Sequence, residues 1–182
     1  MKSVKLIILM LLFSVITFAQ KFNPEIKDGT TMNSYVVMSG SEIEVGLSIS
    51  TNDKGLGINW VVLGFGEGTF QMSKEAVEKG TKMYGGQPLP GITTLNSNET
   101  FALISKAAFK SLKETKAFTY NGFNFVNKTN TESVKINGQE ADVIFVGTEQ
   151  GGVNLWILNN PEFPLIIKSN GLPIDLYISD IR

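Results

Sequence analysis

The sequence predicts a mainly β domain of the α+β class, in which a strongly curved antiparallel sheet or an unclosed β-barrel wraps over two short helices. Three observations predict it: one segment alternates apolar and polar residues, two Asn-Gly pairs separate strand-like runs, and four runs are apolar on both faces. A strand with two apolar faces has to be buried on both of them. A sheet that curves over helices can bury both faces. Such a curved sheet can also enclose an apolar cavity. The four runs are 58–63, 143–146, 155–158 and 165–167.

The first 19 residues are expected to be a secretory signal peptide. Lys2 and Lys5 precede the apolar run Leu6–Phe18, and the small residue Ala19 marks the expected cleavage point. This run is shorter than the about 20 residues that span a membrane; the alternative is an N-terminal anchor that is not removed. We therefore expect one β-rich domain over residues 20–182 that is exported, to the periplasm first of all, or else extracellular or associated with the outer membrane.

The residue types that the sequence lacks exclude several kinds of chemistry. It contains no histidine and no cysteine, which excludes a Ser-His-Asp triad, a thiol nucleophile, a disulfide and the usual zinc ligands. Removing Lys2 and Lys5 with the leader changes the formal charge from −1 to −3, which argues against nucleic acid as a partner. We expect no enzyme, no cofactor and no metal site, and the oligomeric state stays open.

The first half of the chain is expected to form strands and one short helix. In the segment 41–50, apolar residues at every second position alternate with Glu and Ser, as in a half-buried strand. Ser73 is expected to cap a helix that ends at Gly80. The other elements expected in this half are a strand at 58–63, extended chain at 69–72, a proline-containing segment at 85–91 that is neither helix nor central strand, and a polar bridge at 93–98.

Two structures compete for the segment Glu99–Lys113. One is a single helix over the whole segment. The other, which we prefer, is a strand over Thr100–Ile104 followed by a helix capped by Ser105. Aromatic and β-branched residues before the serine favour the strand, and the apolar spacing after it favours a short amphipathic helix.

The second half of the chain is expected to consist of strands and turns. Asn121-Gly122 and Asn137-Gly138 each separate two strand-like runs and predict hairpins. The polar segment Asn159–Pro164 is expected to be a turn, with Phe163 packed beside it. The strands expected in this half are 117–120, 123–126, 133–136, 140–146, 153–158, 165–168 and 174–178.

Motif-like segments of the sequence point to no catalytic or metal site. Gly64–Gly68 lacks the Gly-Lys-Ser/Thr ending of a phosphate-binding loop, and no segment carries the ligand series of an EF-hand. The many phenylalanines and tryptophans are either ordinary core or the lining of a ligand pocket. The residues that we expect to line such a pocket are Trp60, Phe101, Phe125 and Trp156.

The C-terminal part of the chain resembles a known group of proteins. "LWILNNPEFPLIIK" and "IDLYISDI" are similar to the C-terminal end of exported Bacteroidetes-type proteins that are related in fold to the lipoprotein carriers LolA and LolB, and "TFAQ" resembles their leaders. The resemblance implies an unclosed antiparallel barrel over short helices with an apolar cavity. It carries no functional residue across: the carriers hold acyl chains with an arginine inside the barrel, whereas the only arginine here is Arg182.

Two functions follow as hypotheses. The first is a non-catalytic envelope protein that binds an apolar or lipid-like ligand in the concave face of its sheet. The second is a structural or protein-interaction module of the envelope, with a filled core and no ligand. A measured cavity inside the sheet distinguishes the two hypotheses. A hydrolase would instead need two acidic residues that converge in a cleft.

Overall fold

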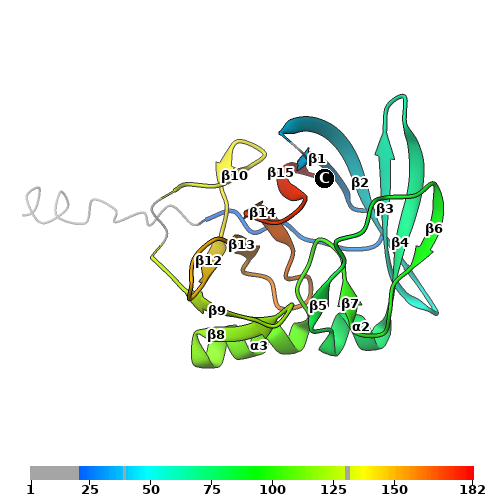
Figure 1. Ribbon diagram of the computed structural model, residues 1–182. Helices are drawn as coiled ribbons and strands as arrows, with labels where there is room; N and C mark the ends of the chain where they lie inside the picture. The colour runs from blue at the N-terminus through cyan, green and yellow to red at the C-terminus, as the bar shows by residue number, and fades with distance from the viewer. Residues whose placement is uncertain (1–20, 39, 130–131) are drawn as a thin grey trace, which may run out of the picture.

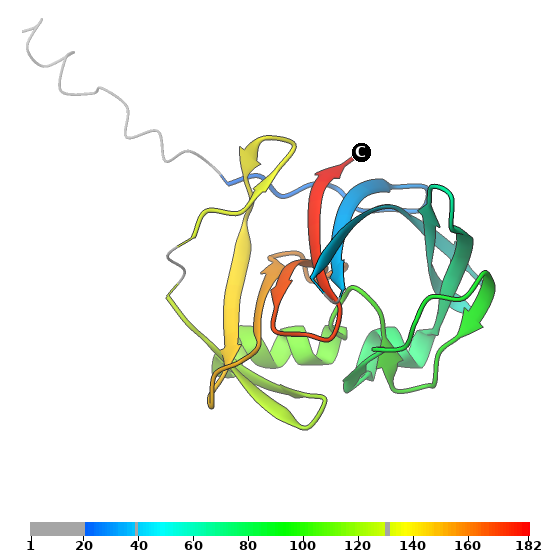
Figure 2. The same ribbon diagram turned by 45° about the horizontal axis from the view of Figure 1, so that its top comes forward.

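The computed structural model describes residues 21–38, 40–129 and 132–182. The expected leader lies outside the described residues. Among these residues, one large sheet, two small two-stranded sheets and two short helices make up the fold, and the large sheet curves without closing into a barrel (Figures 1 and 2). The prediction of a mainly β fold with this architecture is confirmed. The strands of the sheet are β1 (Thr31–Met38), β2 (Ser41–Asn52), β3 (Gly55–Val62), β4 (Gly66–Ser73), β6 (Gly91–Thr94), β8 (Ala117–Tyr120), β9 (Phe123–Asn127), β12 (Val143–Thr148), β13 (Asn154–Leu158), β14 (Ile166–Asn170) and β15 (Asp175–Ile181).

Strands from the two ends of the described chain meet in the middle of the sheet. The spatial order is β6-β4-β3-β2-β1-β15-β14-β13-β12-β9-β8, so β1 and β15 are neighbours. All pairs are antiparallel except β4 with β6, which run parallel. The polar bridge expected at 93–98 is therefore partly wrong, because Gly91–Thr94 is a strand. A parallel neighbour needs a crossover connection, and the segment between β4 and β6 supplies it.

Both helices begin where the sequence places their capping serines. The helix α2 (Lys74–Lys79) follows Ser73, whose Oγ accepts a hydrogen bond from the Ala76 N–H at 3.0 Å. The helix α3 (Lys106–Thr115) follows Ser105, whose Oγ accepts from the Ala108 N–H at 3.2 Å. Each bond satisfies one of the backbone donors that a helix N-terminus leaves unpaired. The two helices lie next to each other at the bottom of the view in Figure 1.

In the segment 99–113, the preferred prediction is confirmed for the helix, whereas the strand is shorter than expected. Only Glu99–Thr100 forms a strand, β7, which pairs in parallel with β5 (Lys82–Met83) in a small separate sheet. The chain then turns at Ala102, whose φ of 57° lies in the left-handed region, and Leu103 makes a single bridge to Leu165. A strand cannot continue through a left-handed residue, so the segment enters the core as irregular chain.

The predicted turns are confirmed. Asn121-Gly122 joins β8 to β9, with φ values of 53° and 77°. Asn137-Gly138 joins the short strands β10 (Lys135–Ile136) and β11 (Gln139–Glu140), with φ values of 53° and 75°. Positive φ at both positions is what a type I′ hairpin requires. In the polar segment before β14, the Asn160 side chain accepts from the N–H of Phe163 at 3.1 Å, which is turn chemistry.

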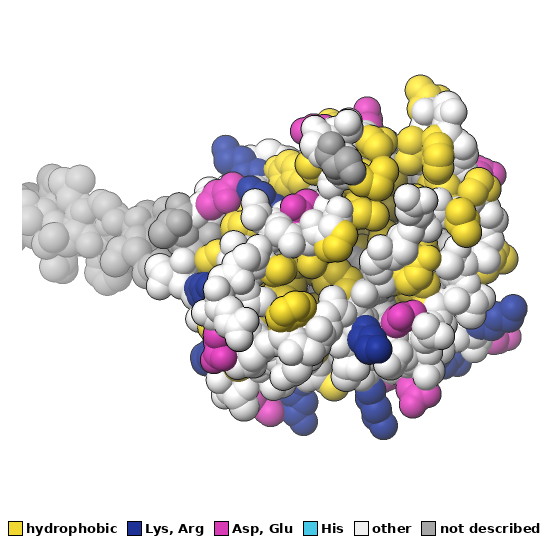
Figure 3. All heavy atoms as spheres, viewed as in Figure 1, with side chains coloured by type: hydrophobic (Ala, Val, Ile, Leu, Met, Phe, Trp, Pro, Cys, Tyr) yellow, Lys and Arg dark blue, Asp and Glu magenta, His cyan; other side chains and the backbone are white. Residues whose placement is uncertain are grey.

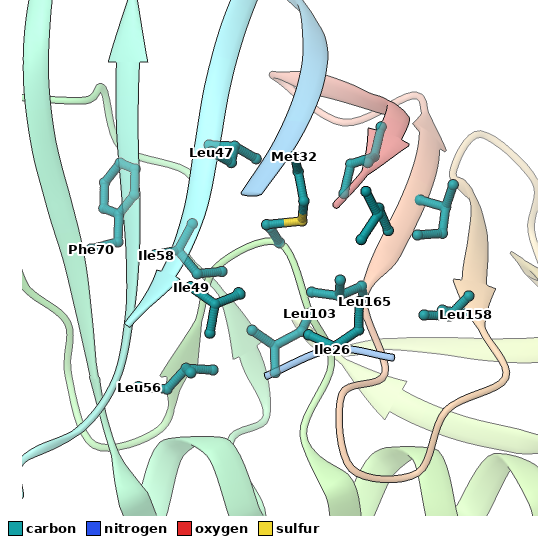
Figure 4. Packing of buried hydrophobic residues seen from close by; sticks show 14 of the residues in the cluster. Ile26, Met32, Leu47, Ile49, Leu56, Ile58, Phe70, Leu103, Leu158 and Leu165 are labelled. Carbon is teal, nitrogen blue, oxygen red and sulfur yellow. The ribbon is translucent and has the colours of Figure 1, made fainter. Parts of the chain in front are cut away.

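The buried apolar residues form two clusters, one on each face of part of the sheet. The first cluster lies inside the curve, where Ile26 from the segment before β1 lies among Leu103 and Leu165 (Figure 4). The second lies between α3 and the strands β8, β9, β12, β13 and β14. Along β13, Leu155 and Ile157 belong to the second cluster, while the alternate residues Trp156 and Leu158 belong to the first. The strand 155–158 is therefore covered on both faces, as expected.

The same expectation is wrong for the run 58–63. Ile58 and Trp60 are buried on the inner face of β3, but Val61 on the outer face is 51% exposed, and Leu63 beyond the strand is fully exposed. Neither helix covers the outer face there: α3 packs on the other half of the sheet, and Ala76, the buried residue of α2, belongs to the first cluster on the inner face.

Candidate functional site

An apolar cavity of about 380 Å³ lies inside the curve of the sheet, on the face that carries the first cluster. It is lined from strands β1 to β4 and β15, from the segment 86–88 and from Phe101. None of the described lining residues is charged, and the amide of the exposed Gln87 is their only side-chain carbonyl. Figure 3 shows hydrophobic side chains gathered on the part of the surface between β2 and β6.

The register of the strands joins the lining residues into continuous rows. Val36 on β1 lies opposite Ile43 on β2 and opposite Leu176 on β15. Leu47 on β2 lies opposite Trp60 on β3. Residues directly opposite each other in a sheet point to the same face, so each row presents a continuous apolar surface to the cavity.

Aromatic rings form one wall of the cavity. The ring centroids of Phe70 and Phe101, which both line the cavity, are 4.1 Å apart. Phe65, in the turn between β3 and β4, lies 6.1 Å from Trp60 and is 61% exposed. Because Phe65 both lines the cavity and contacts solvent, it marks the mouth.

Trp60 is held in place by a glycine on the next strand. Its cross-strand partner on β4 is Gly68. A Cβ atom added at Gly68 would lie 2.9 Å from Cζ2 of the indole and 2.8 Å or less from two backbone oxygens. Only a glycine leaves room there for the indole. Trp60 is 3% exposed, and its Nε1 has no hydrogen-bond partner among the described residues.

The structure brings together two of the four residues expected to line a pocket. Trp60 and Phe101 both line the cavity. Phe125 does not, because it lies in the second cluster with its ring stacked on Phe118 at 5.2 Å. Trp156 does not line it either: its ring packs on Phe145 at 4.7 Å, and the Lys168 ammonium group lies 4.9 Å from its centroid.

The sequence analysis missed those cavity-lining residues whose position depends on the pairing of strands far apart in the sequence. Ile43 belongs to the alternating pattern of β2, so its inward direction was visible in the sequence. Val36 and Leu176 gave no such signal, because they become neighbours only when β1 pairs with β15 from the far end of the chain. Aromatic residues were chosen for their size, which indicates burial but not the cavity that they face.

A larger hollow of about 640 Å³ lies along the polar rows of β2, β3 and β4. Three of its polar side chains already bond one another. The Asn59 amide donates to Ser48 Oγ at 3.1 Å, and Thr69 Oγ1 donates to Asn59 Oδ1 at 2.8 Å. We regard the apolar cavity as the candidate site, because its lining is almost wholly apolar and such a surface gains free energy when a ligand buries it.

Two titratable groups with shifted pKa values lie outside the cavity. Burial raises the pKa of Tyr120, although hydrogen bonds with Thr100 and Ser105 oppose the shift. Its hydroxyl lies 2.7 Å from Thr100 Oγ1 and accepts from the Ser105 N–H at 3.2 Å. A hydrogen bond to Glu162 is the main cause that raises the pKa of the surface residue Lys106. Both groups stabilise contacts between elements of the fold.

Comparisons and composition add little to this geometry. Within the described part of the chain, no three acidic residues gather as metal ligands. Over the same residues, no helix combines the length and the apolar character needed to cross a bilayer. A scan against protein-family models and a search of curated proteins found no match to this chain.

Proposed function

We propose that this protein is an exported, non-catalytic binding protein that holds an apolar or lipid-like molecule in the cavity inside its sheet. The observation that carries the proposal is the cavity of about 380 Å³ with no charged side chain in its described lining. Cavities that bind small ligands usually measure about 300–1,000 Å³ and are mostly apolar. Apolar residues continue to the mouth at Phe65, so an apolar ligand meets a compatible surface on entry.

The size of the cavity limits the ligand and its affinity. At ~30 Å³ each, the volume of a water molecule in the liquid, roughly a dozen methylene groups fill it. Burying them contributes roughly 10 kcal/mol at ~0.8 kcal/mol each. Association costs at least about 4 kcal/mol, which leaves at most about 6 kcal/mol, a Kd of roughly tens of micromolar or weaker. One acyl chain of medium length fits this range.

The alternative hypothesis, a structural envelope module with a filled core, expects no such cavity. The cavity therefore favours the binding protein. The resemblance to lipoprotein carriers stays a prediction. The arginine expected of a carrier has no counterpart in the cavity, because Arg182 lies at the end of the chain, with its guanidinium 3.8 Å from Asp180.

A cavity-filling variant tests the proposal. We expect the protein, exported from its full chain and purified, to bind the fluorescent apolar probe N-phenyl-1-naphthylamine saturably. Val36→Trp places an indole in the cavity and should weaken binding at least about tenfold. The control is Val37→Trp on the same strand, since Val37 is 43% exposed and does not line the cavity; it should stay within about twofold of wild type.

Native mass spectrometry of the same samples gives an independent measurement. Wild type and Val37→Trp should carry a co-purified lipid that Val36→Trp lacks, and circular dichroism should show all three proteins to be folded. Absence of saturable binding by the folded wild type would refute the proposal. Equal binding by Val36→Trp and Val37→Trp would place the ligand outside this cavity.

A further inference from the structure

The segment between β5 and β6 covers part of the cavity on the side that the sheet leaves open. Strands β1 to β4 and β15 supply most of the lining, and they bound the cavity from the concave face of the sheet. Gly86, Gln87 and Pro88 line it from the segment between β5 and β6, together with Phe101. We call residues 85–90 of this segment the strap.

The strap is attached to the rest of the protein only weakly. The Tyr84 N–H just before it donates to the Thr100 carbonyl at 2.8 Å, and pairing with β4 resumes at Gly91. Among the residues that the structure describes, residues 85–90 make no backbone hydrogen bond. Gln87 is exposed and Leu89 is 61% exposed, so the strap also buries little side-chain surface. A segment held by so few contacts separates from the fold at a low cost in free energy.

The sequence of the strap places flexible residues at its ends and stiff residues in its centre. A Cβ atom added at Gly85 or at Gly91 would meet no atom within 4 Å, so the chain has room to rotate at both ends. Pro88 and Pro90 have a fixed φ, and each also restricts the residue before it. The strap is therefore built to move as one stiff piece between two glycine hinges.

The strap lies against β4 beside the mouth of the cavity. A Cβ atom added at Gly66 would lie 3.6 Å from Cγ of Pro90. One added at Gly68 would lie 2.8 Å from the Leu89 carbonyl oxygen, so only a glycine permits this close approach. Phe65, which marks the mouth, directly precedes Gly66 in the chain. The strap and the turn that carries Phe65 therefore lie next to each other at the mouth.

We propose that the strap is a hinged cover, which swings away at Gly85 and Gly91 to admit the ligand and then returns over it. This proposal rests on the proposed function, because it assumes that the ligand occupies this cavity. Closure removes the ligand from water on the side that the sheet leaves open, which stabilises an apolar ligand. A cover of this kind has to open for release as well as for uptake, so it controls both rates.

A cross-link that fixes the strap tests the proposal. The chain contains no cysteine, so an introduced pair gives one defined cross-link. In Phe65→Cys/Gln87→Cys, both replaced side chains are exposed and line the cavity, and a short bifunctional maleimide joins them. Linker added before N-phenyl-1-naphthylamine should slow uptake of the probe at least about tenfold, and linker added afterwards should slow its release similarly. Stopped-flow fluorescence measures both rates against the same protein without linker.

The two single-cysteine variants are the matched controls. Treated with the same reagent, each carries the linker at one end only, so its uptake and release rates should change by no more than about threefold. Mass spectrometry verifies that the cross-link is complete, and circular dichroism verifies that the proteins are folded.

The outcomes separate this inference from the proposed function. Equal rates with and without a complete cross-link overturn the inference, and so does equal slowing in the single-cysteine variants, because the bulk of the linker then explains it. In both cases the probe still binds, and the proposed function stands. Failure of the folded wild type to bind the probe overturns the proposed function, and the inference with it.

Discussion

The two halves of the sheet carry similar apolar runs but pack them differently. In the half around β13, Leu155 and Ile157 pack against α3, and their alternate neighbours pack inside the curve. In the half around β3, Trp60 is buried inside, whereas Val61 on the other face is 51% exposed. The first half is filled on both faces. The second has an open outer face and a cavity on its inner face.

The difference follows from the lengths and positions of the helices. α3 extends over ten residues and buries an apolar side formed by Ala108, Phe109 and Leu112. α2 has six residues, of which only Ala76 is buried. A helix of that length covers little of a sheet. An apolar sequence therefore does not ensure that both faces of a strand are buried. The position of the longer helix decides which strands are buried on both faces.

The largest expected effect comes from the same truncation in each half. Leu155→Ala should lower the free energy of unfolding by about 3–5 kcal/mol, because it opens a new cavity in a filled region. Leu47→Ala should cost only about 2–3 kcal/mol, because this buried leucine already lines a cavity and loses fewer contacts. Urea unfolding with unchanged m-values measures both. Equal losses would mean that the cavity half is packed as tightly as the other.

An intermediate effect on the free energy of unfolding is expected at Tyr120. This residue lies on β8, and its hydroxyl bonds join β8 to the segment 100–105. Tyr120→Phe should cost about 1–3 kcal/mol, because the Ser105 N–H loses its acceptor. The control is Tyr177→Phe, whose hydroxyl bond to the Lys135 carbonyl is exposed, and it should cost less.

The pH dependence of stability sharpens this prediction. Burial raises the pKa of Tyr120 above its ordinary value of 10.0 in the folded protein. Above about pH 10 the unfolded chain therefore releases this proton first, and the folded state loses stability as pH rises toward the folded pKa. Urea unfolding at about pH 8 and about pH 11 should show a smaller alkaline loss in Tyr120→Phe than in wild type. An identical loss in both proteins would contradict the assignment.

The smallest expected effect is on the open face of β3. Val61→Thr should change the free energy of unfolding by no more than about 0.5 kcal/mol, because the side chain already contacts water. The same substitution at Val146, which is fully buried on β12, should cost about 1–3 kcal/mol through the buried hydroxyl. If Val61→Thr were as costly as Val146→Thr, the outer face of β3 would be covered in solution.

The sequence alone predicted the features that depend on a few neighbouring residues. Ser73 and Ser105 cap helices through bonds to an N–H three residues on, and Asn121-Gly122 adopts the positive φ values that its turn needs. The alternation along β2 likewise shows which face is buried. In the candidate site, Trp60 was predictable as a large buried residue, although the cavity that it faces was not.

Only the tertiary structure decided what depends on distant segments. The pairing of β1 with β15 brings Val36 beside Leu176, and the parallel pairing of β4 with β6 has no local signal. Because α3 packs on the half of the sheet that contains β9, Phe125 is buried in the second cluster. The outer face of β3 has no helix on it and stays exposed. The physical reason is the separation in sequence of the residues that interact. Caps and turns form between residues at most four positions apart. Strand register and the burial of a strand's second face instead result from competition among apolar surfaces over the whole chain.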